Sequence, residues 1–367
     1  MENPSIALFT PSLNDGGMEN KTALLANQLF RQGWDVTVWV LNNESQAYRL
    51  DSGIILIDLK IKNKVTALYP LVAKVLALKP GRLVSVSTPF NALWILVKMH
   101  TGYPRHLAVS ERNQLSAVVS HSTKFSDKLR PFIVRTLYPR ADKVLCVSKS
   151  VQADLAAVSR LGEEKLVTLY NMIDIAEIDR LAKEPAPRVL RDLPADLPII
   201  LAIGRLNHQK NHASLIKAFA VVRRKTAARL IILGEGPLRA ELEHLAVETG
   251  FGTDILLPGF DPNPFPWYQR AEVVVLPSLY EGLPGVLLEG LAMRKKIVAA
   301  DCPGGSAEVL MDGKFGRLVP VDDPNSLATA ILDALNKPVD LPALRRRALD
   351  FSTDTLLPEA ISILSKI

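Results

Sequence analysis

Two glutamates around a Gly/Pro turn are the first candidates for chemistry in this sequence. Glu281 and Glu289 lie in the stretch LPSLYEGLPGVLLEGLA (276–292), with seven residues between them. An ionised carboxylate accepts two hydrogen bonds from a vicinal diol, but it does not suit a phosphate. Paired carboxylates also hydrolyse glycosidic bonds, and each glutamate taken alone fits an ordinary surface charge. The pair is therefore a candidate hydroxyl-binding site with two open alternatives.

A pair of cations earlier in the chain favours a diphosphate ligand. Arg205 and Lys210 occur in GRLNHQKNH (204–212), at the end of a predicted strand. Arg offers a planar fork that grips phosphate with two hydrogen bonds, and Lys adds a compact charge. Taken alone, the two side chains fit a surface pair of cations. Together with the glutamates they indicate a sugar nucleotide, which has phosphates in its middle and hydroxyls on both sides, and they argue against a glycoside hydrolase.

Glycine-rich loops follow several of the predicted strands. Gly16 and Gly17 precede the first helix, where backbone N–H groups face an anion, although a plain tight turn fits equally well. Backbone groups of Gly259 and Phe260 could contact a flat ring, with Phe265 or Trp267 beside it unless these two pack in the core. The turn before the helix at 285–292 consists of Gly282, Leu283, Pro284 and Gly285. Its helix dipole favours a negative ligand, and Pro284 fits the first helical turn.

These residues depend on two successive blocks of alternating strands and helices. The strands are near-continuous apolar runs, which is typical of parallel sheets buried on both faces. The first block has predicted strands at 5–12, 35–41, 53–59, 82–88, 105–111, 143–148 and 165–171. The second has predicted strands at 198–206, 228–236, 254–260, 272–278, 296–301 and 317–323. We expect an α/β protein with two doubly wound, Rossmann-like domains that face each other across a cleft.

Length and composition indicate the number of domains and the cellular compartment. The chain has 367 residues, 48% of them hydrophobic, which allows two domains with large cores. We expect an N-terminal domain at 1–180, a Pro-rich linker at 181–198, a C-terminal domain at 199–350, and a final helix at 351–367 that packs back on the first domain. The chain has two distant cysteines in apolar runs and no basic leader, which predicts a cytoplasmic protein. It has no uncharged apolar run of about 18 residues, so we expect no transmembrane helix.

Positive charge is concentrated in one part of the first domain. Residues 60–149 hold 16 Lys/Arg against three Asp/Glu, whereas the whole chain has a net charge of +6. This region favours an anionic partner such as phosphate groups or a membrane surface, although a solvated basic face is equally compatible. Only 6% of the residues are aromatic and no RNA-binding signature occurs, so we do not expect a nucleic-acid partner.

The motifs together resemble the large retaining glycosyltransferase family with the GT-B fold, family 4, also called glycosyl transferases group 1. The resemblance covers nearly the whole chain and is closest to bacterial enzymes of surface-polysaccharide, lipopolysaccharide or lipid-linked oligosaccharide synthesis. It rests on NDGGMENKT, VSKSVQADL, LYNMID, GRLNHQKN, the Glu-x7-Glu stretch and CPGGSAEVLMDGKFGRLVPVDD.

The resemblance implies a role for each candidate residue. The donor would be a nucleotide sugar, with uridine expected as the base. Glu289 would bind the ribose and Glu281 the sugar hydroxyls, while Arg205 and Lys210 hold the diphosphate, so Glu281, Arg205 and Lys210 are the expected catalytic residues. The other expected donor contacts are Gly16, Gly17, Gly259, Phe260, Gly282, Leu283, Pro284 and Gly285. Retention of configuration, no enzymic nucleophile and no metal or other cofactor are implied, and no Asp-x-Asp motif occurs.

The chain departs from the family pattern at two places. Arg294 stands where the family usually has glycine, so this helix end either differs or faces the donor. At 109–114, where some members carry a useful histidine, the sequence is VSERNQ. We expect Arg112 to contact either the donor or a phosphate of the acceptor, and we assign Arg112 and Asn113 to the binding of the acceptor, a glycan or lipid-linked saccharide.

The basic residues 60–149 fit a peripheral contact at the inner face of the cytoplasmic membrane. Two alternatives to a hexosyl- or N-acetylhexosaminyl-transferase remain at this point. One is a GT-B-fold sugar-nucleotide epimerase, and the other is a non-catalytic sugar-nucleotide binding protein.

Overall fold

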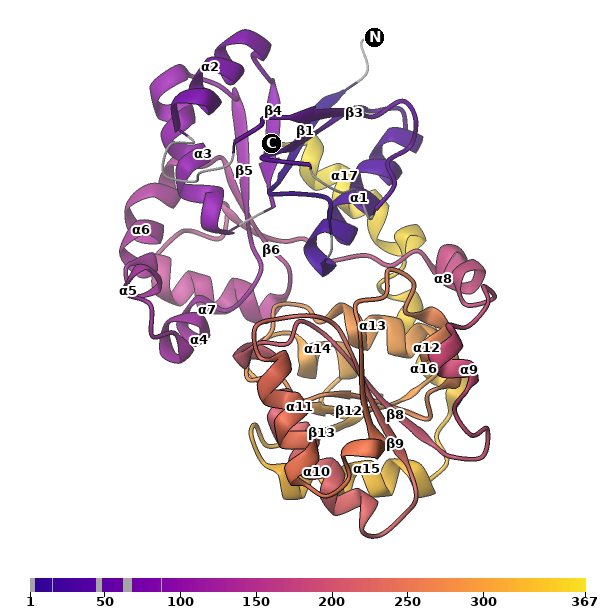
Figure 1. Ribbon diagram of the computed structural model, residues 1–367. Coiled ribbons are helices and arrows are strands. Elements are labelled where there is room, and N and C mark those ends of the chain that lie inside the picture. Colours follow the sequence, from indigo (N-terminus) through magenta and orange to yellow (C-terminus); the bar gives the residue numbers. More distant parts are fainter. Residues whose placement is uncertain (1–3, 15, 44–47, 62–67, 87) are drawn as a thin grey trace. The chain divides into compact units, whose positions relative to one another are not determined.

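The computed structural model describes residues 4–14, 16–43, 48–61, 68–86 and 88–367. It divides into two compact units (Figure 1). Unit 1 consists of Met1–Met172 and Thr353–Ile367, and unit 2 of Ile173–Ser352.

The first unit is built on a parallel sheet with strand order β3-β2-β1-β4-β5-β6-β7. Its strands are β1 (Ser5–Thr10), β2 (Asp35–Val40), β3 (Ile55–Asp58), β4 (Arg82–Ser85), β5 (His106–Glu111), β6 (Lys143–Cys146) and β7 (Leu166–Thr168). Its helices are α1 (Gly17–Arg31), α2 (Leu68–Leu78), α3 (Thr88–Thr101), α4 (Leu115–His121), α5 (Phe125–Lys128), α6 (Arg130–Leu137), the 3₁₀ turn η1 (Tyr138–Arg140), α7 (Lys149–Ser159) and α17 (Thr353–Ser365).

Both faces of this sheet are covered, as the apolar strands predict. Ile6 and Leu8 of β1 pack into one core, whereas Phe9 lies on the opposite face because side chains alternate along a strand. There the ring of Phe9 meets the ring of Trp94 from α3 edge to face, with 5.1 Å between centroids. The α/β prediction is therefore confirmed for this unit.

The second unit repeats the plan with strand order β10-β9-β8-β11-β12-β13, all parallel. Its strands are β8 (Ile199–Ile203), β9 (Arg229–Leu233), β10 (Ile255–Gly259), β11 (Val273–Leu276), β12 (Lys296–Ala300) and β13 (Arg317–Val319). Its helices are α8 (Ile175–Leu181), α9 (Arg188–Arg191), η2 (His208–Lys210), α10 (His212–Arg223), α11 (Arg239–Glu248), η3 (Gly252–Asp254), α12 (Phe265–Arg270), α13 (Gly285–Ala292), α14 (Ser306–Leu310), α15 (Pro324–Asn336) and α16 (Leu341–Leu349).

The strand order explains where a ligand site belongs in each unit. Order along the sheet reverses between β1 and β4 in the first unit, and between β8 and β11 in the second. Loops at such a switch point diverge to opposite faces and leave a crevice beyond the carboxyl ends of the strands. The loops that carry Arg205, Lys210 and Glu281 follow β8 and β11, so the fold brings them to the switch point of unit 2.

The unit boundary differs from the sequence expectation of a linker at 181–198. Residues 173–198 belong to unit 2, and they are tied to it by hydrogen bonds. The Arg270 guanidinium donates to the carbonyls of Pro194 (2.6 Å) and Leu197 (3.2 Å), and the Asn263 amide donates to the carbonyl of Leu181 (3.0 Å). Proline and charge mark an irregular chain here, but its backbone is bound to the unit.

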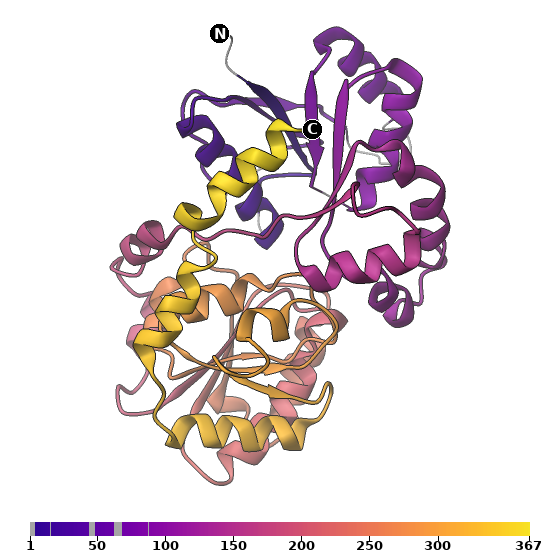
Figure 2. The same ribbon diagram turned by 180° about the vertical axis from the view of Figure 1, so that it is seen from behind.

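The final helix α17 belongs to unit 1, where it lies beside α1 (Figure 2). Leu364 and Ile367 enter the same core as Ile6 and Leu8 of β1. Arg82 of β4 donates from Nε to the carbonyl of Ile367 at 3.0 Å. Residues of α17 and just after it therefore complete a core that β1 begins.

Leu364→Ala should lower the free energy of unfolding of unit 1 by about 3 kcal/mol, because it leaves a cavity in a fully buried site. Urea unfolding followed by circular dichroism measures the change. Lys366→Ala, on the exposed side of the same chain end, is the control. Equal midpoints for Leu364→Ala and the wild type would show that α17 contributes nothing to this core.

Candidate functional site

The loops after β8 and β11 are held together by their backbones. Leu279 donates its N–H to the carbonyl of Gln209 at 2.8 Å, and the Gln209 side-chain amide donates to the carbonyl of Tyr280 at 3.0 Å. The cation loop and the glutamate loop therefore form one rigid piece. This geometry brings Lys210 and Glu281 together, as the sequence analysis expects.

Glu281 is a nearly buried carboxylate, with 6% of its surface exposed. The Lys210 ammonium Nζ lies 2.6 Å from Glu281 Oε1, and the Ser278 hydroxyl donates to the same oxygen at 2.6 Å. Burial makes these partners necessary, because an unpaired buried charge is costly. Within the described parts of the chain, no hydrogen bond reaches Glu281 Oε2, which leaves this oxygen to accept a ligand hydroxyl. The sequence analysis missed Ser278, whose only signal was its place after a buried strand.

A second Gly-rich loop fixes the backbone of Glu281. The N–H of Glu281 donates to the carbonyl of Pro303 at 2.9 Å, and that of Gly305 to the carbonyl of Gly282 at 2.7 Å. Gly304 between them has a φ of +133°, and a Cβ there would lie 2.3 Å from the carbonyl oxygen of Glu281. Only glycine allows this approach, so the loop 303–305 determines where the carboxylate stands.

Arg205 is the exposed cation of the site. No ion pair or hydrogen bond of its guanidinium occurs among the residues that the structure describes, whereas Lys210 is engaged by Glu281. Arg205 can therefore bind an anion without first breaking an interaction within the protein. The Lys210 ammonium would have to contact Glu281 and the ligand at the same time.

Helix α13 starts directly after the glutamate loop and carries Glu289 in its second turn. Pro284 is the residue that caps this helix, one position earlier than the expected first turn. The Tyr268 hydroxyl lies 3.1 Å from Glu289 Oε2 and 3.2 Å from the carbonyl oxygen of Val286. Burial, and then the charge of Glu289, raise the pKa of Tyr268 well above its usual value. Tyr268 is thus a permanent neutral donor that orients Glu289, a role that the sequence analysis missed.

Gly259 is the last residue of β10, and Phe260 follows it at the start of the Pro-rich loop. Phe260 is 40% exposed, whereas Phe265 and Trp267 are buried. The Trp267 indole donates to Asp261 Oδ2 at 2.7 Å, and the rings of Phe265 and Tyr268 stack with centroids 5.9 Å apart. Phe265 and Trp267 therefore pack in the core, which leaves Phe260 as the exposed ring of this loop.

Unit 1 holds its own candidates at the ends of its strands. Gly16 caps α1 with a φ of +140°, and its neighbour Gly17 is the first helical residue. Asp15 lies outside the described residues.

Arg112 follows β5 and lines a small cavity with Lys21 of α1. Burial lowers the pKa of Arg112 to about 10, opposed by the charge of Glu19. Arg112 and Asn113 are both half-buried, and their predicted acceptor contacts stay predictions.

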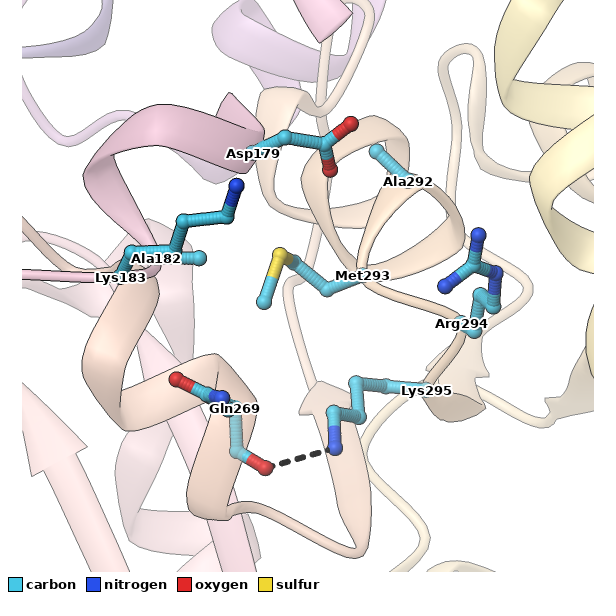
Figure 3. Close-up of a pocket in the computed structure, with 8 residues that line it drawn as sticks. All are labelled: Asp179, Ala182, Lys183, Gln269, Ala292, Met293, Arg294 and Lys295. Carbon is cyan, nitrogen blue, oxygen red and sulfur yellow. Dashed lines mark hydrogen bonds between the residues drawn. The ribbon is translucent and has the colours of Figure 1, made fainter. Parts of the chain in front are cut away.

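Arg294 lies at the far end of α13 from the glutamate loop. Its φ of +54° is left-handed, a conformation that glycine adopts without strain, which explains why glycine is usual there. Arg294 lines a cavity of about 440 Å³ with Asp179, Lys183 and Lys295 (Figure 3). The Lys295 ammonium donates to the carbonyl of Gln269 at 2.9 Å. Arg294 and its cavity thus lie after the C-terminal end of α13, whereas the turn at Gly282–Gly285 leads into its N-terminal end.

No group of three or more His, Cys, Asp or Glu side chains in the described parts of the chain is placed to hold a metal ion. No helix in those parts has the length and apolar character needed to cross a membrane.

Comparison with known proteins agrees with this architecture. The sucrose-phosphate synthase of Thermosynechococcus elongatus has a similar structure, with a TM-score of 0.81 at 21% identity over 99% of each chain. The Anabaena protein HepE, solved in complex with UDP and glucose, has a TM-score of 0.79 at 18% identity over 99% of each chain. These likenesses show the GT-B fold, two Rossmann-like domains in tandem.

Sequence comparison defines the family. Residues 15–177 match the family described as Glycosyltransferase Family 4, and residues 197–337 match Glycosyl transferases group 1. The N-acetylgalactosamine-N,N'-diacetylbacillosaminyl-diphospho-undecaprenol 4-alpha-N-acetylgalactosaminyltransferase of Campylobacter jejuni is 32% identical, over 88% of this chain and 87% of that one. A second Campylobacter jejuni alpha-1,4-N-acetyl-D-galactosaminyltransferase is 25% identical over 99% of this chain and 98% of that one. The chain belongs to glycosyltransferase family 4 and is a glycosyltransferase.

Lys210→Met should destabilise unit 2 by about 3 kcal/mol, because it leaves the Glu281 carboxylate buried without a cation. Adding Glu281→Gln should restore most of that loss, since no charge then remains uncompensated. Urea unfolding of the four proteins of this cycle measures both effects. Lys217→Met, an exposed position on α10, is the matched control. A double variant no more stable than Lys210→Met would contradict an energetic coupling between the two charges.

Proposed function

We propose that this enzyme transfers a sugar from a nucleotide-diphosphate sugar to a glycan or lipid-linked saccharide acceptor, with retention of configuration and without a metal ion. The observation that carries the proposal is the strand-end arrangement of unit 2. An exposed Arg205, a Lys210 that is paired with a nearly buried Glu281, and the start of α13 lie on interlocked loops. This arrangement offers cations to a diphosphate and a carboxylate to sugar hydroxyls.

Donor binding would redistribute the Lys210–Glu281 interaction. The Lys210 ammonium has three donors, so it can keep Glu281 and still contact a diphosphate oxygen. Arg205 would add two parallel hydrogen bonds to the diphosphate. Glu281 Oε2 would accept a sugar hydroxyl, and Glu289, oriented by Tyr268, would accept the ribose hydroxyls. Each of these contacts is a proposal supported by the distances within unit 2.

The chemical step follows from these contacts and from the family. The acceptor hydroxyl oxygen attacks the anomeric carbon on the face from which the diphosphate leaves. The new carbon–oxygen bond forms as the bond to the diphosphate oxygen breaks, and the acceptor proton passes to the leaving diphosphate. Negative charge grows on the diphosphate, where Arg205 and Lys210 are already fixed, so the transition state gains more than the ground state. The two cations would supply the charge that a metal ion supplies elsewhere.

For the donor we propose a uridine diphosphate sugar, with N-acetylgalactosamine tested first. For the acceptor we propose a polyprenyl-diphosphate-linked saccharide. The two Campylobacter jejuni relatives are named as N-acetylgalactosaminyltransferases that act on undecaprenol-linked saccharides, and this supports both choices. We also propose that the enzyme acts in bacterial surface-glycan synthesis, in the cytoplasm at the inner face of the membrane.

Uridine diphosphate sugars, and not GDP- or ADP-sugars, should raise the melting temperature of the wild type. A donor at 100 times its dissociation constant adds about 2.7 kcal/mol. Arg205→Ala should abolish this shift, whereas Lys217→Ala should keep it. A shift by another base class would reassign the nucleotide, and an unchanged shift in Arg205→Ala would refute the proposed phosphate grip.

Lys210→Ala should reduce the transfer rate by a factor on the order of 10² to 10³, because it removes fixed stabilisation of the leaving diphosphate. Radiolabelled sugar transfer to a polyprenyl-diphosphate N-acetylgalactosamine acceptor measures the rate. EDTA should leave the wild-type rate unchanged. A rate that collapses in EDTA and returns with a divalent cation would overturn metal independence.

A stripe on α5 and α6 supports the proposed membrane contact. Phe125 and Phe132 are 74% and 67% exposed, and Leu129 between them is also exposed. Phe125 begins α5, Phe132 lies in the first turn of α6, and Leu129 joins the two helices. Exposed cations flank the stripe at Lys124, Lys128 and Arg135, and Asp127 is paired with Arg130 at 2.8 Å. Aromatic rings flanked by cations suit the interface of an anionic bilayer, where the rings enter the headgroup region and the cations contact the lipid phosphates.

Lys62 and Lys64 of the basic region lie outside the described residues.

Phe125→Ser/Phe132→Ser should weaken binding to phosphatidylglycerol vesicles by at least about tenfold, because two rings no longer enter the interface. Vesicle sedimentation, with phosphatidylcholine vesicles for comparison, measures binding. Val247→Ser removes a side chain of similar exposure (71%) from unit 2 and should not change it. Equal binding by the wild type and the double variant would exclude this stripe as the contact.

A further inference from the structure

A closed polar network surrounds Glu111, the last residue of β5, and the donor chemistry does not use it. Glu111 is almost fully buried, and so are Ser85, Asn91 and Tyr138 around it. Strand β5 lies inside the sheet between β4 and β6. A buried carboxyl group at the end of an interior strand needs partners, and these come from other parts of unit 1.

The network joins three elements through the two oxygens of Glu111. Tyr138 of η1 donates its hydroxyl hydrogen to Oε1, and the Asn91 amide of α3 lies 3.3 Å from the same oxygen. Thr88, the first residue of α3, donates to Oε2 at 3.2 Å. The Asn91 amide also donates to the carbonyl of Ser110 at 2.9 Å, and Asn91 Oδ1 accepts from Ser85 at 2.8 Å.

The partners of Glu111 are neutral, and no ion pair of this carboxylate occurs within the described residues. Burial raises the pKa of Glu111 to about 7, opposed by the Tyr138 hydrogen bond, the charge of Arg130 and the bonds from Asn91 and Thr88. The titratable groups that face it are Tyr138 and Cys146, both with raised pKa values. The charge of Arg130 on α6 also acts on it. Near neutral pH, therefore, Glu111 exists in both protonation states.

The chain leaves this network directly into the predicted acceptor loop. Arg112 and Asn113 are the next two residues, and Arg112 lines the strand-end cavity of unit 1. The carbonyl of Glu111 is also fixed, because it accepts from the N–H of Val147 at 3.3 Å. The position of Glu111 thus sets the point from which the loop departs.

We propose that Glu111 is a positioning residue for the acceptor: its ionised carboxylate ties α3 and η1 to the end of β5 and so fixes the backbone that carries Arg112 and Asn113. This inference rests on the proposed function, because it concerns the acceptor of that reaction. The ionised carboxylate accepts from Tyr138, Asn91 and Thr88 together. The neutral acid must itself donate one hydrogen, so it holds fewer of these donors and the loop is less constrained.

The inference predicts a pH-dependent acceptor affinity. If only the ionised form presents the loop correctly, the KM for the acceptor rises about tenfold from pH 8 to pH 6, while kcat changes much less. Donor affinity, which belongs to unit 2, stays constant. Glu111→Gln should have an acceptor KM that does not change over this range, because the amide does not titrate. Glu163→Gln, an exposed position in the same unit, should behave like the wild type.

A second variant covers the case in which Glu111→Gln does not fold. Tyr138→Phe removes a hydrogen bond that lowers the pKa of Glu111, so its KM profile should turn at a higher pH than that of the wild type. A wild-type KM that is flat from pH 6 to pH 8, or a Glu111→Gln profile that follows the wild type, would overturn the inference.

Thermal unfolding separates this inference from the proposed function. A carboxyl group whose pKa is raised by folding binds a proton in the native state but not in the unfolded state between its two pKa values. Stability therefore falls as pH rises from about 4.5 to about 7. The melting temperature of the wild type relative to Glu111→Gln should fall between pH 5 and pH 8. Absence of transfer at every pH would refute the proposed function, and a flat melting difference would then overturn the titration of Glu111.

Discussion

Nearly complete burial of the Glu281 carboxylate is the constraint on which the donor half of the molecule depends. The carboxylate must meet a cation, and Lys210 on a different loop provides it at 2.6 Å. This pairing requires the loops after β8 and β11 to be neighbours, which the pairing of β8 with β11 in the sheet provides. It also requires Gly304, because any side chain there would collide with the carbonyl of Glu281.

The two units handle a buried strand-end carboxylate in opposite ways. Glu281 lies in the loop after β11 and has an ammonium partner, so its charge is balanced by direct contact. Glu111 ends a strand and contacts a hydroxyl, an amide and a phenol, so its direct partners are neutral, and the charge of Arg130 acts on it without an ion pair. Glu111, buried among neutral partners, has a pKa raised to about 7, so it can gain or lose a proton near neutral pH.

The sequence predicted the strands of both sheets more completely than the hydrogen-bond partners of the site glutamates. Each apolar run predicted as a strand coincides with a strand in the described part of the chain, because burial on both sheet faces leaves an unmistakable pattern. Ser278, Tyr268 and Tyr138 were missed, since each acts on a glutamate through contacts that only folding creates. The linker was predicted at 181–198 because this stretch is rich in proline and charged residues. Such a composition indicates an irregular backbone, but it cannot show the hydrogen bonds from Arg270 and Asn263 that attach this stretch to unit 2.

Helix α17 makes the first unit discontinuous along the chain, and this has a consequence for biosynthesis. Residues 1–172 leave the ribosome first, but their core lacks Leu364 and Ile367 until the whole of unit 2 has been made. At roughly 5–20 residues per second, the intervening segment takes on the order of ten to forty seconds to translate. During that time the apolar side chains of unit 1 that pack against Leu364 and Ile367 lack these partners. The nascent chain therefore exposes apolar surface that chaperones can bind until α17 has been made and has docked.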